Sequence, residues 1–501
     1  MGGMDASDPV PAPKEVSARV LRALRRRKPL WRFLAAFCRA VENAGGKPYL
    51  TGGIVRDLAE GRAGKDIDLM VSGVGFEGLG RILRSLPSRP LEILRILPVG
   101  KAFAVYKVRT AWAKEELDVA LARTERSIGP GHREFRFRTR NVDAREDVGR
   151  RDFTINSLLF AFRTDKGRLT GTVMDFFGGL ADLRRKRIRG VGNAEDRFRE
   201  DPLRMLRAIR QKNERKGYSI EKKTWAAIRR VAPDLFRTIP AERVIEELLR
   251  SLSADPVRTM DDLRRSGILP ILLPEVRGLR KDALGKMKRR YAILEKRLGH
   301  TLPEHVLLAN LLVDFAEDEC RGRLRGAARK STAGGVPKPA GGREGLLFRL
   351  PRTEGIARRL HFPKVRSVVR MLEDLARLRD IDRMRNRHAR IEAIFARWET
   401  PEPLLALYEA ASRAAGREEF DFLPVLREAA RRPALLSGKR LIEIGIPAGP
   451  GMETVLETLR NATLTGIVGT AGEAERMALR IHRRKPAARR RADHSPHRDR
   501  K

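Results

Sequence analysis

The sequence of 501 residues contains only two cysteines, Cys38 and Cys320. Two thiols cannot build a disulfide framework or a zinc site made of cysteines alone, so we expect both to be small buried side chains. No apolar run is long enough to span a membrane, and the N-terminus lacks the apolar core of a secretory signal. We therefore expect a cytoplasmic protein without a membrane partner. The length exceeds that of one compact core and predicts several domains.

Acidic side chains are too few to balance the basic ones. There are 64 Asp and Glu against 105 Lys and Arg, a formal net charge of +41. Such an excess favours a polyanionic partner, whereas the alternative is a solvated surface that is simply rich in arginine. Part of the excess lies in RVLRALRRRK near the start and in HRRKPAARRRADHSPHRDRK at the end. We expect both segments to be disordered and to hold phosphates without specificity.

The spacing of apolar residues separates an α/β region from a helical region. A helix is predicted over 30–44, and strands are predicted in KPYLTGGIV, KDIDLMVSG, RPLEILRILPVGKAFAVYKVR and EELDVALART. Segments such as AERVIEELLRSL and SVVRMLEDLARLRDI then have helical periodicity. The predicted fold class is an α/β head, with a small mixed sheet and helices, followed by all-α domains. A linker rich in Gly, Ala, Pro and Lys occupies 323–345.

Two aspartates, Asp66 and Asp68, stand one residue apart at a predicted strand. On a strand they would face the same side and repel each other unless a cation lay between them, and hard oxygen ligands suit Mg²⁺. Asp118 offers a third carboxylate on a neighbouring strand, and three such groups could hold two metal ions. The alternatives are a solvated strand end for the pair and, for Asp118, an ion pair with Arg123.

Gly52 and Gly53 follow the first predicted strand, and Arg56 lies on the next helical turn. Glycines allow backbone N–H groups to approach a polyphosphate closely, and Arg56 would supply a phosphate contact. Alone, the two glycines would indicate only a tight turn. Together with the nearby aspartate pair, they predict a nucleoside triphosphate held by backbone and metal.

A second Arg-Asp pair, Arg151 and Asp152, lies in GRRDFTINSLLF. The arginine could contact phosphate or ribose oxygens, and the aspartate could accept a hydrogen bond from a ribose hydroxyl. The alternative is a helix N-cap with a local ion pair.

The segment REDPLRMLRAIR places acidic and basic side chains at helical spacing, and its plain interpretation is a salt-bridged surface helix. A more specific interpretation comes from the edges of the bases. Adenine and cytosine each present an amino donor beside a ring-nitrogen acceptor, which one Asp acceptor and one Arg donor would match. Guanine and uracil would leave polar groups unpaired and be rejected. The residues concerned are Asp201, Arg204, Arg207 and Arg210.

The segments GGIVRD, KDIDLMV, ALARTERSIGPGHREF, RRDFTINSL, REDPLRMLRAIR and IPAERVIEELLRSL occur in this order and resemble the class II tRNA nucleotidyltransferase and poly(A) polymerase family. The resemblance implies a nucleotidyltransferase head with a helical neck, body and tail, and Mg²⁺ on Asp66 and Asp68. It implies nucleotide contacts from Gly53, Arg56 and Arg151. It also implies base recognition by Asp201 and Arg204, supported by Arg207 and Arg210.

Two subfamilies compete. ALARTERSIGPGHREF and the segment from SGKRLIEIGIP onward resemble CCA-adding enzymes, which complete the 3′ end of tRNA with CTP and ATP. RRDFTINSL and the Arg-rich C-terminus equally resemble poly(A) polymerases, which extend mRNA and other RNA 3′ ends with ATP alone. We expect the CCA-adding activity, and a non-catalytic RNA-binding protein is a third hypothesis. His305 and Asp314 form no His-Asp dipeptide, so we expect no phosphohydrolase activity.

These features predict seven regions. They are a basic disordered extension (1–28), a catalytic head (29–192), a nucleotide-selecting neck (193–252), a helical body (253–322), a linker (323–345), a helical RNA-binding body and tail (346–480) and a basic disordered tail (481–501).

Overall fold

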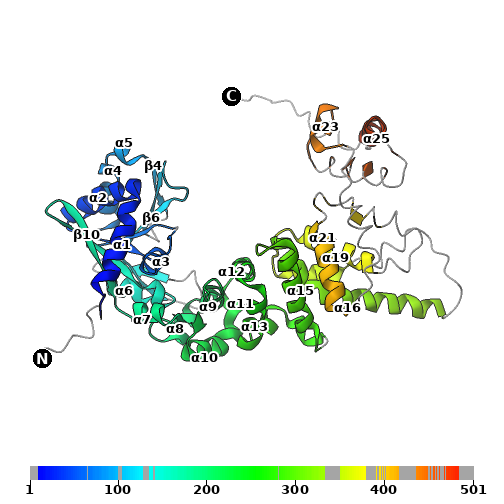
Figure 1. Cartoon of the computed structure of the whole chain (residues 1–501), viewed down its shortest axis with the longest axis horizontal. Helices are drawn as coiled ribbons and strands as arrows, with labels where there is room; N and C mark the ends of the chain where they lie inside the picture. The colour runs from blue at the N-terminus through cyan, green and yellow to red at the C-terminus, as the bar shows by residue number, and fades with distance from the viewer. Residues whose placement is uncertain are drawn as a thin grey trace, which may run out of the picture. The chain divides into compact units, whose positions relative to one another are not determined.

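The computed structural model describes residues 10–64, 66–99, 104–127, 135–138, 142–279, 281–332, 350–379, 402–416, 436–449 and 470–483, with single residues and pairs between 391 and 468. The chain forms two compact units, Met1–Arg277 and Gly278–Lys501, and each is described by itself (Figure 1). Within the described residues, no helix combines the length and the apolar character that crossing a membrane would require.

An eight-stranded sheet is the core of the first unit, in the order β1-β10-β9-β2-β3-β6-β5-β4. Its neighbours pair antiparallel except β3 and β6, which are parallel, so the predicted mixed sheet is confirmed. The strands are β1 (Val10–Pro11), β2 (Lys47–Thr51), β3 (Asp68–Ser72), β4 (Ile93–Val99), β5 (Val105–Thr110), β6 (Leu117–Leu121), β9 (Leu159–Asp165) and β10 (Arg168–Asp175). Two small pairs lie outside this sheet: β7 (Thr124–Ser127) with β8 (Phe135–Arg138), and β11 (Arg187–Ile188) with β12 (Ser219–Ile220).

Amphipathic helices complete the core around the sheet. In α2 (Lys28–Asn43), side chains spaced three or four residues apart are buried, which is the stripe expected of a helix that covers a sheet. Phe33 stacks on Phe37, with ring centroids 5.9 Å apart. Cys38 lies in this stripe, and Cys320 is also buried, as expected. The other helices here are α3 (Gly53–Ala59), α4 (Phe76–Ser85), α5 (Ser88–Leu91), α6 (Ala144–Gly149) and α7 (Gly179–Arg184).

The N-terminal segment contradicts the expectation of disorder over 1–28. Helix α1 (Lys14–Arg26) packs against β10 and α3, and it buries Val20 and Leu24 completely. The Ser17 hydroxyl accepts a hydrogen bond of 3.0 Å from the Val173 backbone N–H. The prediction was wrong because Val20 and Leu24, one helical turn apart, form an apolar stripe between the arginines of this segment. The helix buries this stripe against its neighbours.

Seven helices continue the first unit. Helices α9 and α12 pack against each other, and α13 packs against both. Asn213 Nδ2 donates to Thr259 Oγ1 at 3.1 Å and Lys212 forms a 2.6 Å ion pair with Asp262, so α13 belongs to this unit. The predicted boundary at residue 252 therefore falls inside the unit. The helices are α8 (Ala194–Glu200), α9 (Leu203–Asn213), α10 (Lys222–Val231), α11 (Leu235–Thr238), α12 (Ala241–Ala254), α13 (Pro256–Ser266) and α14 (Leu269–Leu272).

The second unit is helical where it is described, as predicted. Inside it, the fully buried Arg290 donates from Nε to Asn310 Oδ1 at 2.6 Å and pairs with Asp314. His305 is half-buried on α16. Its helices are α15 (Ala283–Leu298), α16 (Glu304–Thr332), α18 (Pro351–Arg359), α19 (Val365–Arg379), α21 (Glu402–Ala414), α23 (Gly438–Glu443) and α25 (Ala471–Arg483).

Two predicted boundaries of the second unit need correction. The linker expected over 323–345 begins inside a helix, because α16 continues to Thr332, and the rest of it lies outside the described residues. The disordered tail expected from residue 481 likewise begins inside α25, which ends at Arg483. Residues 484–501 lie outside the described residues.

Candidate active site

A sharp turn joins β2 to α3 and brings the backbone against an acidic side chain. Gly52 has φ +79°, and a Cβ there would lie 2.9 Å from Asp68 Oδ2. A Cβ on Gly53 would lie 3.1 Å from the Arg56 guanidinium. Position 52 therefore requires glycine for its conformation and for this contact, whereas a side chain at position 53 would need the Arg56 guanidinium to shift by a few tenths of an ångström.

The three aspartates come together beside this turn. Asp68 is the first residue of β3 and is in register with Asp118 on the parallel neighbour β6. Asp66 precedes the strand, so the strand geometry invoked for the pair is wrong, yet Asp66 and Asp68 line the same hollow. Burial raises the pKa of Asp68 to about 6; Arg151 opposes this shift, while Asp118 and Asp66 add to it.

The described basic groups near these carboxylates include Arg151, which acts on Asp68, and Lys107. Asp118 makes a 3.6 Å ion pair with Lys107, and its Oδ1 is buried without a hydrogen-bond partner in the described part of the chain. Among the described residues, no three His, Cys, Asp or Glu side chains are arranged to enclose a metal ion by themselves. Two carboxylates with open positions left for water or phosphate oxygens are nevertheless the usual protein share of a Mg²⁺ site, so Asp66 and Asp68 fit such an ion.

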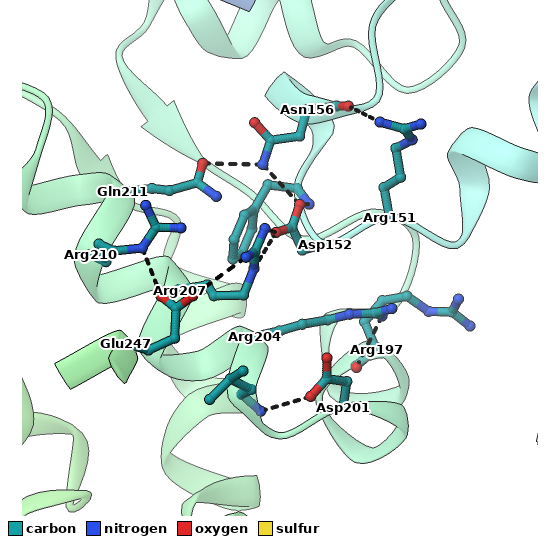
Figure 2. A network of polar contacts seen from close by, with 12 residues as sticks. Arg151, Asp152, Asn156, Arg197, Asp201, Arg204, Arg207, Arg210, Gln211 and Glu247 are labelled. Carbon is teal, nitrogen blue, oxygen red and sulfur yellow. Dashed lines mark hydrogen bonds and ion pairs between the residues drawn. The ribbon is translucent and has the colours of Figure 1, made fainter. Parts of the chain in front are cut away.

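An ion pair between the buried Asp152 and the partly exposed Arg207 joins the segment before β9 to α9 (Figure 2). Arg207 Nε donates to Asp152 Oδ2 at 2.9 Å, and the Asn156 side-chain amide donates to Asp152 Oδ1 at 2.8 Å. Burial alone would raise the pKa of Asp152, but Arg207, Asn156 and Arg204 outweigh it and lower the pKa to about 2. The carboxylate is only 7% exposed, so its described partners are protein groups.

Arg204 and Asp201 lie at the start of α9. Asp201 follows α8 and accepts a 3.1 Å hydrogen bond from the Leu203 N–H, so it is outside the helix that the sequence predicted for it. Arg204 donates to the carbonyl oxygen of Arg150 at 3.0 Å and to Glu200 at 3.2 Å. These contacts fix the Arg204 guanidinium in the hollow that Asp201 also lines (Figure 2).

Arg207 and Arg210 share one acidic partner on α12. Arg210 Nε donates to Glu247 Oε2 at 2.7 Å, and Arg207 lies 3.6 Å from Glu247 Oε1. Arg210 also donates to Glu214 at 2.8 Å. Glu247 was not predicted as a site residue. It lies on α12, and no pattern in the sequence indicates that α12 packs against α9.

One hollow of about 510 Å³ brings all the predicted site residues except Asp118 together. A second hollow of about 500 Å³ contains Asp118 and shares Asp66 and Asp68 with the first. The predicted residues lining the first are Gly52, Gly53, Arg56, Asp66, Asp68, Arg151, Asp152, Asp201, Arg204, Arg207 and Arg210. Sequence reasoning missed its other lining residues, namely Arg150, Asn156, Gln211, Glu214, Arg243 and Arg250. Asn156 stands within the quoted RRDFTINSL, and Gln211 lies one helical turn after Arg207, which are the signals that could have found them.

Two family models match the first unit. The model described as the Poly A polymerase head domain matches residues 48–189, which contain the glycine turn and the three aspartates. The model described as the probable RNA and SrmB-binding site of polymerase A matches residues 217–279.

Curated relatives and solved structures are similar to a larger part of the chain. A Multifunctional CCA protein of Cupriavidus pinatubonensis is 36% identical over 313 residues, which are 55% of this chain and 70% of the relative. One from Xylella fastidiosa is 36% identical over 239 residues, and there the chain spans about half of the relative, 51%. A solved CCA-adding enzyme in an apo form covers 92% of the chain with a TM-score of 0.60 at 20% identity, which speaks for the fold alone. The extent and identity of the first match show that the chain belongs to the class II family of CCA-adding enzymes and poly(A) polymerases.

Proposed function

We propose that the chain is a tRNA CCA nucleotidyltransferase, which adds nucleotides from CTP and ATP to the 3′ end of tRNA without a nucleic-acid template. The observation that carries the proposal is the hollow in which Asp66 and Asp68, a glycine turn and the start of α9 meet. The names of the relatives and neighbours support it: Multifunctional CCA proteins, and CCA-adding enzymes solved with CTP and with a tRNA.

In the proposed reaction, the 3′-hydroxyl oxygen of the tRNA attacks the α-phosphorus of the nucleotide. The new oxygen–phosphorus bond forms, the bond from the α-phosphorus to the bridging oxygen breaks, and pyrophosphate leaves as the hydroxyl proton is released. Asp66 and Asp68 would hold Mg²⁺, with Asp118 as the third carboxylate beside them. Bound Mg²⁺ would supply charge neutralisation for the attacking and leaving oxygens. The protein's own contribution is to position the two reactants.

The remaining predicted residues divide between the two ends of the nucleotide. Gly52 and Gly53 would let the triphosphate approach the backbone, and Arg56 and Arg151 would donate to its oxygens. At the other end, Asp201 and Arg204 would pair with the base edge. Asp152, Arg207 and Arg210 would support that end of the nucleotide, and the basic helical surfaces would bind tRNA by its shape and backbone.

The test is nucleotide incorporation on a tRNA that ends before CCA, first with CTP alone and then with ATP. Incorporation of CMP followed by one AMP supports the proposal. Use of ATP alone would favour a poly(A) polymerase or an A-adding enzyme instead, the alternative that the matched head-domain model keeps open. No extension with any nucleotide would leave the non-catalytic RNA-binding hypothesis.

A further inference from the structure

Arg56, which lines the candidate triphosphate site, is held from two sides. Its Nε donates to Asp57 Oδ1 at 2.9 Å and its NH2 group donates to Asp57 Oδ2 at 3.3 Å. Its NH1 group donates to the side-chain oxygen of Asn156. A guanidinium has five N–H groups, so these contacts fix the plane of Arg56 and leave donors for an anion.

The Asn156 contact depends on a residue of α9. Gln211 Oε1 accepts from Asn156 Nδ2 at 3.2 Å, and Asp152 accepts from the same amide nitrogen at 2.8 Å (Figure 2). Two acceptors on the nitrogen side orient the Asn156 amide, so that its oxygen is turned toward Arg56. Gln211 is only 4% exposed, so no bulk water replaces this contact if it is lost.

The contact between Arg56 and Asp57 depends on Arg215, which lies four positions after Gln211. Arg215 donates from NH2 to Asp57 Oδ1 at 2.7 Å and from NH1 to Glu60 Oε2 at 2.7 Å. The Tyr218 hydroxyl donates to the other Glu60 oxygen. Arg215 is 5% exposed, and its two acceptors lie on α3 and at its C-terminus, the helix that carries Arg56.

We propose that Gln211 and Arg215 are positioning residues that hold Arg56 in place for the triphosphate, Gln211 through Asn156 and Arg215 through Asp57. This inference rests on the proposed function. It gives α9 two roles. The start of the helix would recognise the base through Arg204, and its C-terminal turn would position Arg56 for the triphosphate. Because every nucleotide carries the same triphosphate, the second role is independent of the base.

The test measures binding of CTP and of ATP, each with Mg²⁺, to the full chain by titration calorimetry. We expect Gln211→Met and Arg215→Met each to raise both dissociation constants by about fivefold, the usual net effect of one lost hydrogen bond. The factor should be the same for CTP and ATP. In an Arg56→Met background, neither substitution should weaken binding further, because they act through Arg56.

Lys216→Met is the matched control, since Lys216 is exposed in the turn that follows Arg215 and its loss removes the same charge. Unchanged dissociation constants in Gln211→Met, or an equal loss of affinity when Arg56 is already absent, would overturn the proposal. Gln211→Met keeps the test open if Arg215→Met fails to fold. An enzyme that incorporates ATP alone would contradict the proposed function only, because its ATP affinity would still respond to both substitutions.

Discussion

The pKa values of two carboxylates that line one hollow are shifted in opposite directions. Burial, Asp118 and Asp66 raise the pKa of Asp68 to about 6 although Arg151 opposes them. Asp152 is more deeply buried, yet Arg207 and its neighbours lower its pKa to about 2. Asp152 is thus paired with Arg207, whereas burial and the acidic neighbours of Asp68 outweigh the effect of Arg151 on its pKa. The contrast supports the proposal that Asp68 holds a cation, whereas the described partners of Asp152 are groups of the protein itself.

The largest effect is expected from the β3 side. Asp68→Asn should lower kcat/KM for nucleotide incorporation by about 10³-fold, because metal-based charge stabilisation is worth several kcal/mol. Initial-rate measurements with and without added Mg²⁺ would check this. Asp165→Asn, at the exposed end of β9, removes one carboxylate from the same sheet and should keep full activity. If Asp68→Asn retained activity, the contrast between the two sides would have no functional meaning.

On the α9 side, the expected effect is on stability and its pH dependence. Asp152→Asn should lower the free energy of unfolding by about 2 kcal/mol at neutral pH, since a depressed pKa stabilises the folded state. This stabilisation is complete above the ordinary aspartate value near 4 and is lost as the pH falls through about 2. Urea unfolding at pH 7, 4 and 3 should therefore show a difference that shrinks only at the most acidic point.

The exposed Asp196 provides the control for that measurement. Asp196→Asn should change the unfolding free energy by less than about 0.5 kcal/mol. A pH-independent loss in Asp152→Asn would mean that lost packing, and not the charge of the pair with Arg207, explains the effect.

Selectivity should change when Arg204 is replaced. Arg204→Met should reduce discrimination against UTP and GTP by about tenfold or more, because the base edge would lose its designated donor. Competition between correct and incorrect nucleotides on the same RNA measures this ratio. Arg229→Met, exposed on α10, should keep the wild-type ratio. An unchanged ratio in Arg204→Met would place base recognition elsewhere in the hollow.

The smallest expected effect is on stability and concerns Arg27, which contacts the backbone just before Asp66. Arg27 donates to the Gly64 carbonyl oxygen at 2.8 Å. Arg27→Met should cost about 1 kcal/mol of stability, the net worth of one hydrogen bond. Thermal unfolding would measure it against Arg22→Met, a substitution at an exposed position of α1. Equal midpoints for the two variants would show that the Arg27 contact contributes nothing.

The glycine turn, the aspartates and the arginines of α9 could be predicted because each is encoded within a short segment. Gly52 and Asp68 are 16 residues apart, and strand pairing between β2 and β3 brings them together. Glu247 and Arg215 could not be predicted, because their partners lie on other elements and any surface helix carries similar charges. The fold class was predictable from apolar spacing. Helix α1 was not, because its many arginines concealed the apolar stripe that β10 and α3 bury.

The pairing of the first strand with the last strand of the sheet affects how the chain folds during its synthesis. β1 pairs with β10, and the Ser17 hydroxyl meets the Val173 N–H across 156 residues of sequence. A ribosome would need on the order of ten seconds or more to make that stretch. Until then, the part of α1 that packs against β10 would have no surface to cover, so the nascent head would remain incomplete.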